Sequence, residues 1–334
     1  ITNEYPISYY LLTIFGNSLT NFDIAAYDER TEEQIVLPIK KLFYNGYALI
    51  IDRNIFPDEN KIRVHDLIKD TEFEAGYDKL LISTGAIPFM PDIKGINLKN
   101  VFKLRTLEDG ISLREKLRES KKAVIIGGGY IGLELLEAFV SNKVHTTMIE
   151  RSKYIMPILD TELSELVQGF VENMYPEYTS ILNNDNVVEF IGEDEVKAVK
   201  TQNGEMIETD FVLVAAGVRP VVDIAKDAGI LLGTTGAIKV NSRMQTNIKN
   251  IYACGDCSEN VYSMTGIPAW IPLGSNANKE GRCAAINMCG EVEDFEGVLG
   301  SAVTKYFGLT ISMTGFTEKF AQKNGYDTVS VMII

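Results

Sequence analysis

A glycine-rich segment between a short apolar run and an amphipathic stretch restricts the fold of this chain more than any other feature. It lies within residues 121–150, "KKAVIIGGGYIGLELLEAFVSNKVHTTMIE". The run "AVIIG" is continuous and apolar, as buried parallel strands are. "YIGLELLEAFVSN" repeats its apolar residues at helical spacing, and "VHTTMIE" is typical of a second strand. The segment therefore predicts a βαβ unit with a right-handed crossover.

The glycines of this unit match G-x-G-x-x-G, which between a strand and a helix is typical of a dinucleotide-binding turn. We expect Gly127 to permit the turn, Gly129 to let the backbone approach a pyrophosphate, and Gly132 to let helix and strand pack closely. Glu150 ends the second strand 18 residues after Gly132, near the roughly 20 expected of the acid that binds the adenosine ribose. Its charge would repel a 2′-phosphate and so favours NADH over NADPH, a preference that Arg151 and Lys153 weaken. The alternative is a glycine-rich turn of an ordinary α/β core.

A strand followed by a small-residue turn occurs twice in similar form. "LLISTGAIP" (80–88) and "VLVAAGVRP" (212–220) share three apolar residues, two small ones, a glycine and a final proline, and they lie 132 residues apart. A chain of 334 residues is long enough for about two domains. The two patterns therefore predict two related α/β domains.

Composition excludes several classes of protein. The net charge of −14, without a run rich in lysine and arginine, argues against a nucleic-acid partner. The longest apolar run, "FVLVAAGV" (211–218), is far shorter than the roughly 18 residues of a membrane span. Four cysteines, all within 254–289, do not make a disulfide scaffold, so we expect reduced thiols and a soluble, cytoplasmic protein. The first residues, "ITNEYPISYY", lack a methionine and a signal pattern, and residue 1 is expected to be a truncation or processing point.

The stretch "IYACGDCSEN" (251–260) has two interpretations. Cys254 and Cys257 have the spacing of a redox dithiol or of half a zinc site, although no second ligand pair exists for zinc. Alternatively, a strand delivers Gly255-Asp256 at its carboxyl end, where open α/β sheets bind ligands and Asp256 would accept hydrogen bonds from sugar hydroxyls. A turn with a helix-capping aspartate would have the same sequence.

Five stretches together resemble the FAD-dependent pyridine nucleotide-disulfide oxidoreductases. They are "VIIGGGYIGLE", "LISTGAIP", "VLVAAGVRP", "IYACGDCSE" and "WIPLGSNANKEGR". The last of these, with "GVLGSAVTKYFGLTISMTGFTE", is most similar to the branch of NADH oxidases, NADH peroxidases and coenzyme A-disulfide reductases. The resemblance covers about residue 75 to the C-terminus. It implies an α/β fold with two Rossmann-like domains, the NAD domain inserted in the FAD domain, and the start of a C-terminal α+β interface domain.

The resemblance also implies boundaries and site residues. The FAD domain would comprise residues 1–110 and 246–296, the NAD domain 111–245, and the interface domain would begin in 297–334. Tyr130 would cover the flavin until nicotinamide enters, with Glu134 beside the nicotinamide. Asp256 would bind the FAD ribityl chain, and a helix N-terminus within 273–279 would face the flavin. The further cofactor-binding candidates are Ile131, Gly217, Thr84, Gly85, Gly255, Leu273, Gly274 and Ser275.

Three departures from the family pattern bear on function. The first G-x-G-x-x-G, which would bind the FAD pyrophosphate, is absent, and Glu4 is a candidate for the acid on the FAD ribose. No cysteine lies in residues 1–253, so a sulfenate or mixed-disulfide mechanism has no nucleophile there. The segment "NEYPISYY" is similar to relatives that reduce rubredoxin-like carriers or accompany nitrite reductases. The interface domain is also short of its full length.

These observations predict a flavoprotein oxidoreductase that passes a hydride from NAD(P)H to FAD and electrons onward. The acceptor is expected to be oxygen, a disulfide such as coenzyme A disulfide, or a small electron carrier. The alternatives are an NADH:rubredoxin-type reductase, or a nucleotide-binding or electron-relay subunit that is inactive alone. The expected partners are this small acceptor and a second copy in a homodimer, with no nucleic acid, membrane or metal.

Overall fold

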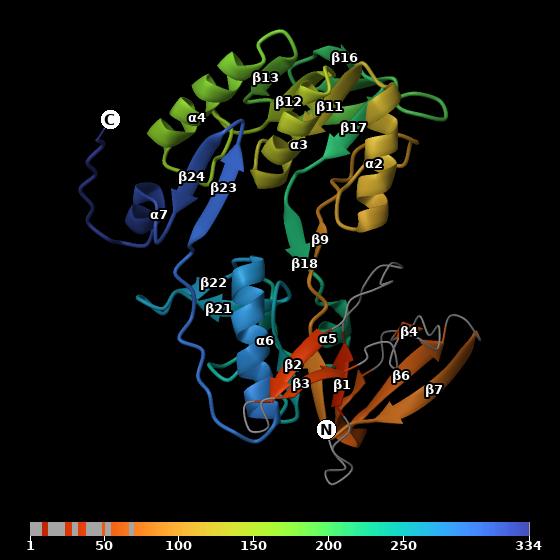
Figure 1. Cartoon of the computed structure of the whole chain (residues 1–334), viewed down its shortest axis with the longest axis vertical. Coiled ribbons are helices and arrows are strands. Elements are labelled where there is room, and N and C mark those ends of the chain that lie inside the picture. The colour runs from red at the N-terminus through yellow and green to blue at the C-terminus, as the bar shows by residue number, and fades with distance from the viewer. Residues whose placement is uncertain are drawn as a thin grey trace. The chain divides into compact units, whose positions relative to one another are not determined.

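The computed structural model describes residues 55–66 and 70–333 together with four short strands before them, Tyr9–Leu12, Ile24–Asp28, Glu33–Leu37 and Leu49–Ile50. The chain divides into two compact units. Unit 1 comprises Ile1–Ala86 and Pro220–Val298, and unit 2 comprises Ile87–Arg219 and Leu299–Ile334. Unit 2 is therefore largely inserted into unit 1, and in Figure 1 the red and orange N-terminal strands belong with the cyan and blue elements α6, β21 and β22.

A parallel sheet of five strands forms the centre of unit 2. Its order is β10-β17-β11-β12-β13, with bounds Val101–Phe102, Phe211–Val214, Lys122–Ile126, His145–Glu150 and Thr179–Asn183. The helices of this part are α2 (Leu107–Glu119), α3 (Tyr130–Ser141) and α4 (Thr161–Met174). The predicted strand–helix–strand unit is thus confirmed as β11, α3 and β12.

Apolar residues fix the position of α3 on this sheet. Leu133, Leu136 and Phe139 are fully buried and contact the side chains of β11 and β17, and the ring of Phe139 packs edge-on against that of Phe211 at 5.2 Å. This regular spacing is the helical period that the sequence shows.

Smaller elements complete unit 2. An antiparallel sheet contains β14 (Val187–Ile191), β15 (Ala198–Thr201) and β16 (Met206–Glu208). The hairpin of β23 (Ala302–Tyr306) and β24 (Leu309–Met313) packs beside α3, and α7 (Glu318–Lys323) follows it. The sequence of 302–334 predicts strands and a helix, with a strand at its end, "TVSVMII". Within the described chain this last strand is not formed: residues 327–333 pair with no strand, and Thr328 and Ser330 donate to the Glu318 carboxylate.

Unit 1 contains a parallel three-stranded sheet of order β1-β8-β20, with β8 (Lys79–Ile82) between β1 and β20 (Ile251–Ala253). Helix α6 (Gly274–Met288) packs against β20. The other elements of this unit are strands β2 (Ile24–Asp28), β3 (Glu33–Leu37), β4 (Leu49–Ile50), β5 (Ile55–Phe56), β6 (Lys61–Asp66), β7 (Thr71–Gly76), β19 (Ile238–Lys239), β21 (Ser258–Val261) and β22 (Pro268–Ala269), the 3₁₀ helix η1 (Pro57–Glu59) and α5 (Asp223–Asp227).

The two similar sequence patterns lie where the chain passes between the units. "LLISTGAIP" forms β8 and then β9 (Ala86–Pro88), and "VLVAAGVRP" forms β17 and then β18 (Val218–Pro220). The strand and turn predicted for the second pattern are thus β17 and the residues around Gly217, which takes φ +106°, and a further short strand, β18, follows this turn. Strands β9 and β18 pair with each other.

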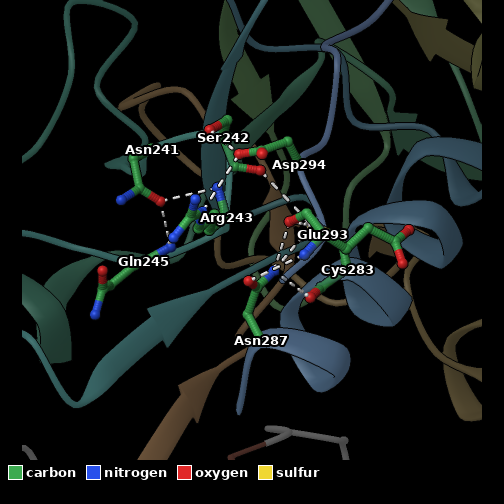
Figure 2. Close-up of polar contacts among 8 residues, drawn as sticks. All are labelled: Asn241, Ser242, Arg243, Gln245, Cys283, Asn287, Glu293 and Asp294. Atoms are coloured by element: carbon green, nitrogen blue, oxygen red, sulfur yellow. Dashed lines mark hydrogen bonds and ion pairs between the residues drawn. The ribbon is translucent and has the colours of Figure 1, made fainter. Parts of the chain in front are cut away.

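The acidic stretch 291–296 is exposed, as the sequence suggests, and it is also anchored (Figure 2). The Asn287 amide donates to the Glu293 carbonyl at 2.7 Å and accepts from the Glu293 N–H at 3.4 Å. The Ser242 hydroxyl donates to the Asp294 carboxylate at 2.6 Å, and the guanidinium of Arg243 lies 3.5 Å from the same group.

Within the described part of the chain, no helix combines the length and the apolar character that a bilayer crossing requires.

Candidate cofactor-binding sites

The glycine-rich turn of unit 2 has the geometry that its pattern predicts. Gly127 takes φ +104°, and a Cβ on it would lie 2.4 Å from the Ala215 carbonyl oxygen. A Cβ on Gly132 would lie 2.0 Å from the Gly127 carbonyl oxygen. Neither position has room for a side chain, since real Cβ contacts are longer than 3 Å. Gly132 therefore lets the start of α3 lie directly against the end of β11, and Gly127 lets the turn between them lie against Ala215, which follows β17.

Gly129 is different, because its surroundings are open. No atom of the described chain lies within 4 Å of a Cβ built on it, and its φ of −86° suits any residue. It is the N-cap of α3, and no side chain caps this helix end. The first turn of a helix has N–H groups without partners and a partial positive charge. The space at Gly129 and the uncapped terminus together form a cradle for an anion such as a pyrophosphate.

Glu150 lies beside this cradle, at the end of β12. It is buried, and its two carboxylate oxygens accept one hydrogen bond each, from the Gly128 N–H at 2.7 Å and from the Ser152 N–H at 2.8 Å. A carboxylate has about four acceptor sites. Half of this capacity therefore remains for the hydroxyls of a ribose, and the backbone bonds hold the carboxylate in place.

Tyr130 and Glu134 lie one turn apart on α3. Tyr130 is half-buried, burial raises the pKa of its phenol, and its hydroxyl donates to the sulfur of Met313 at 3.6 Å. Glu134 is exposed. Tyr306 is fully buried, and burial, helped by Glu134, raises its pKa to about 12. Ile131 is the second residue of the same helix, and its side chain is partly buried.

Gly217 follows β17 at the same edge of the sheet. Its carbonyl accepts from the Phe89 N–H at 2.8 Å, and apart from its chain neighbours no atom of the described residues lies within 4 Å of a Cβ built on it. The space beside its backbone is therefore open, as it is at Gly129.

In unit 1, the carboxyl ends of β8 and β20 bring two predicted segments together. The Cys254 N–H donates to the Ile82 carbonyl at 3.1 Å, and a Cβ on Gly255 would lie 3.8 Å from the Ser83 hydroxyl. The hydroxyl of Thr84 is buried and donates to the Val221 carbonyl at 2.5 Å. Gly85 takes φ +70° with open space at its Cβ position.

The Asp256 carboxylate is half-buried, and no hydrogen bond or ion pair to it occurs among the described residues. Burial raises the pKa of this carboxyl. Its backbone carbonyl accepts from the Trp270 indole N–H at 2.8 Å. A desolvated acid without a partner is typical of binding sites.

The N-terminus of α6 lies near this aspartate. A Cβ on Gly255 would lie 3.5 Å from the Cβ of Ala277, in the first turn of the helix. Leu273 is the N-cap and no side chain caps the helix, whose first residues are Gly274 and Ser275. The turn at Gly255-Asp256 and the uncapped helix end therefore belong to one site.

Glu280, on α6, is a site residue that sequence reasoning missed. It is buried, and its Oε2 accepts from the Gly255 N–H at 2.7 Å and the Ser258 hydroxyl at 3.0 Å. Its Oε1 accepts from the Asn260 amide at 2.8 Å. Burial raises the pKa of Glu280, with a further contribution from the charge of Asp256. In "NKEGR" a glutamate is typical of a solvated helix face, so the sequence has no local signal for this role.

The thiols of "CGDC" are buried. Cys254 has a pKa raised by burial to about 12, and burial also raises the pKa of Cys257, whose Sγ donates to the Cys254 carbonyl at 3.3 Å. Both are free thiols. Among the described residues, no group of three or more His, Cys, Asp or Glu side chains is arranged to hold a metal ion.

The predicted site residues thus fall into two groups. Unit 2 brings together the glycine-rich turn, Tyr130, Glu134 and Glu150. Unit 1 brings together Thr84-Gly85, Gly255-Asp256 and the start of α6. Glu4 lies outside the described residues.

Comparison with known proteins agrees with this arrangement. The family model described as "Pyridine nucleotide-disulphide oxidoreductase" matches residues 13–281. The chain is 37% identical over 278 residues to an "NAD(P)H sulfur oxidoreductase (CoA-dependent)" of Pyrococcus abyssi, covering 83% of this chain and 61% of the relative. The fold of this chain also matches the solved structure of an NAD-dependent persulfide reductase from A. fulgidus. The TM-score is 0.77 at 33% identity, and the match covers 82% of this chain and 50% of that one.

A water-forming NADH oxidase from Lactobacillus brevis, solved with NADH, matches with the same TM-score of 0.77 at 27% identity, covering 84% of this chain and 60% of that one. The predicted α/β fold with Rossmann-like units is thereby confirmed. The chain spans about three-fifths or less of the length of these three proteins.

Proposed function

Because the chain belongs to the pyridine nucleotide-disulphide oxidoreductase family, we propose that it is an FAD-dependent NAD(P)H oxidoreductase. In this proposal, unit 2 binds the nicotinamide dinucleotide and unit 1 binds FAD. The bound flavin supplies the chemistry, which is acceptance of a hydride and delivery of electrons to an acceptor. The side chains of this protein bind and orient the two cofactors.

The observation that carries the proposal is the cradle at Gly129. It combines open space, an uncapped helix terminus and a carboxylate with spare acceptor sites, which fit a pyrophosphate and a ribose respectively. Because Glu150 faces the ribose position with a negative charge, we propose a preference for NADH over NADPH. Tyr130 and Glu134 extend from the same helix end and would flank the nicotinamide.

The fit of unit 1 to FAD rests on different groups. The Asp256 carboxylate lacks a partner in the described chain and would accept from ribityl hydroxyls, and bonds of this kind would compensate its burial. The uncapped N-terminus of α6 would place a positive dipole near the electron-rich part of the reduced cofactor. Thr84, whose hydroxyl is already bonded to Val221, would contribute backbone and shape at the FAD side.

For the acceptor we propose oxygen or a sulfur compound such as a disulfide, as the names of the relatives suggest. A small electron carrier of the rubredoxin type is the second candidate, favoured by the absence of cysteine from residues 1–253. A homodimer is proposed from the family resemblance.

An anaerobic NADH titration of the purified chain, followed in the visible flavin band, tests the proposal. The expected result is a yellow chromophore that bleaches with about one equivalent of NADH. Reoxidation by air, coenzyme A disulfide or rubredoxin then identifies the acceptor. A colourless chain that takes up no added FAD would contradict the proposal and favour a nucleotide-binding subunit.

A further inference from the structure

Glu280 joins two parts of the unit 1 site, helix α6 and the turn at Gly255-Asp256, and it also contacts strand β21. It extends from α6, the helix whose uncapped N-terminus borders the site. Its carboxylate accepts from the turn at Gly255 and from Ser258 and Asn260 in β21. The side chain is 2% exposed, so these bonds are its only stabilisation against burial among the described residues.

Both oxygens of the Glu280 carboxylate act as acceptors. The Gly255 backbone N–H, which can only donate, faces Oε2, and the Asn260 NH₂ group donates to Oε1. The ionised carboxylate satisfies both, although burial raises its pKa. Hydrogen bonds to a charged group are the stronger kind, and a buried donor that loses such an acceptor is costly to leave unsatisfied.

These bonds act on the residue next to Asp256. Gly255 takes φ +78°, and its N–H is held by Glu280 while the Asp256 carbonyl is held by Trp270. The turn is thus fixed on both sides, and only the Asp256 side chain is without a partner in the described chain. The same glutamate ties this turn to the helix that begins at Gly274.

We propose that Glu280 is a positioning residue for FAD binding: it fixes the position of the Asp256 carboxylate relative to the N-terminus of α6. This inference rests on the proposed function. Glu280 does not itself contact the cofactor in this proposal, and it acts through Gly255-Asp256.

The test measures the dissociation constant of FAD by fluorescence titration of the full-length apoprotein, for wild type and three variants. In Glu280→Ala both acceptor oxygens are lost, and the Gly255 N–H and the Asn260 amide lose their partner, so we expect FAD affinity to fall about 10-fold or more. In Glu280→Gln only one oxygen is replaced, by an NH₂ group. The side-chain carbonyl can still accept from the Gly255 N–H, and the Asn260 amide can turn over so that its own carbonyl accepts from the new NH₂, so affinity should stay within about threefold of wild type.

Glu259→Gln is the matched control. Glu259 is also buried in unit 1, but its carboxylate accepts from the Thr235 N–H, away from the Asp256 turn. Its FAD affinity should stay within about twofold of wild type. The circular dichroism spectrum and thermal midpoint of each variant report that the chain, unit 1 included, is folded. NADH affinity, which the proposal assigns to unit 2, should be unchanged in all variants.

The outcomes separate two failures. Wild-type chain that binds no FAD would overturn the proposed function, and this inference with it. Wild-type binding with unchanged affinity in Glu280→Ala, or an equal loss in the Glu259 control, would overturn this inference alone. Should Glu280→Ala not fold, Ser258→Ala removes one donor without changing the charge, and a fall of about threefold is expected. Wild-type affinity there would also overturn the inference.

Discussion

Gly132 has no space for even one methyl group, because its Cβ position lies 2.0 Å from the Gly127 carbonyl oxygen. In Gly132→Ala, helix α3 has to move away from the end of β11. We expect a loss of about 1–3 kcal/mol of stability, as for other overpacked sites, and weaker NADH binding. Thermal unfolding followed by circular dichroism measures the first effect and an NADH titration the second. A variant with the wild-type midpoint would contradict the assigned packing.

Gly129→Ala should have the opposite profile. Its Cβ position is open and its φ of −86° is allowed for alanine, so the unfolding midpoint should stay within a degree or two of wild type. The added methyl occupies the space assigned to the pyrophosphate, so NADH affinity should fall about 10-fold or more. Isothermal titration calorimetry measures the affinity. Unchanged binding would show that the dinucleotide does not approach this turn.

The thiols differ in reactivity because burial raises the pKa of Cys254 to about 12 and also raises that of Cys257, while Cys289 is exposed. A raised thiol pKa means that the neutral, unreactive form is retained as the pH rises past the ordinary value of 8.5. At pH 8 to 10, Ellman's reagent should therefore modify one thiol quickly in the native chain and all four after unfolding. Cys289→Ser should abolish the fast phase. A fast phase that persists would mean that "CGDC" is accessible.

At the scale of elements, the sequence predicts those parts whose signal is local. Strand β11, helix α3 and strand β12 follow from apolar periodicity, and Gly127 and Gly132 from the turn between them. Glu280 could not be predicted, because its partners Gly255 and Asn260 are more than 19 residues away in sequence and only the fold brings them to α6. The strand expected in 327–333 fails for a similar reason. Alternating apolar residues favour a strand only when a neighbouring strand offers a partner.

The acidic stretch 291–296, which follows α6, is held in place by Asn287 (Figure 2). Its buried amide donates to the Glu293 carbonyl and accepts from the Glu293 N–H. Asn287→Ala leaves the carbonyl and the N–H of Glu293 without their hydrogen-bond partner, which should lower the free energy of unfolding by about 1–3 kcal/mol. Hydrogen exchange should become faster in residues 291–298, with little change in unit 2. Unchanged exchange in these residues would show that other contacts hold the acidic stretch 291–296 in place.

At the scale of the whole molecule, the chain leaves unit 1 after Ala86 and returns at Pro220. The sequence predicts two related domains from the patterns ending in "AIP" and "VRP". It could not predict that these two ends, β9 and β18, pair with each other, since strand pairing between distant segments has no local signal. In the proposed function each unit builds its binding site from its own residues, so the two sites should fail independently.

Asp256→Asn tests this independence. Burial raises the folded-state pKa of Asp256 above its unfolded value, so the neutral form is favoured in the fold; the resulting stability is full below the unfolded pKa and lost as pH rises through the folded pKa. At pH 7 the ionised carboxylate of the wild type is therefore destabilised by its burial. Asparagine at this position should slightly raise the unfolding midpoint of the apoprotein. FAD affinity should fall about 10-fold or more while NADH affinity stays within about twofold, the reverse of Gly129→Ala, which should keep FAD and lose NADH. Loss of both ligands in either variant would contradict separate sites, and a lower midpoint for Asp256→Asn would mean that the carboxylate stabilises the fold and is not held for a ligand.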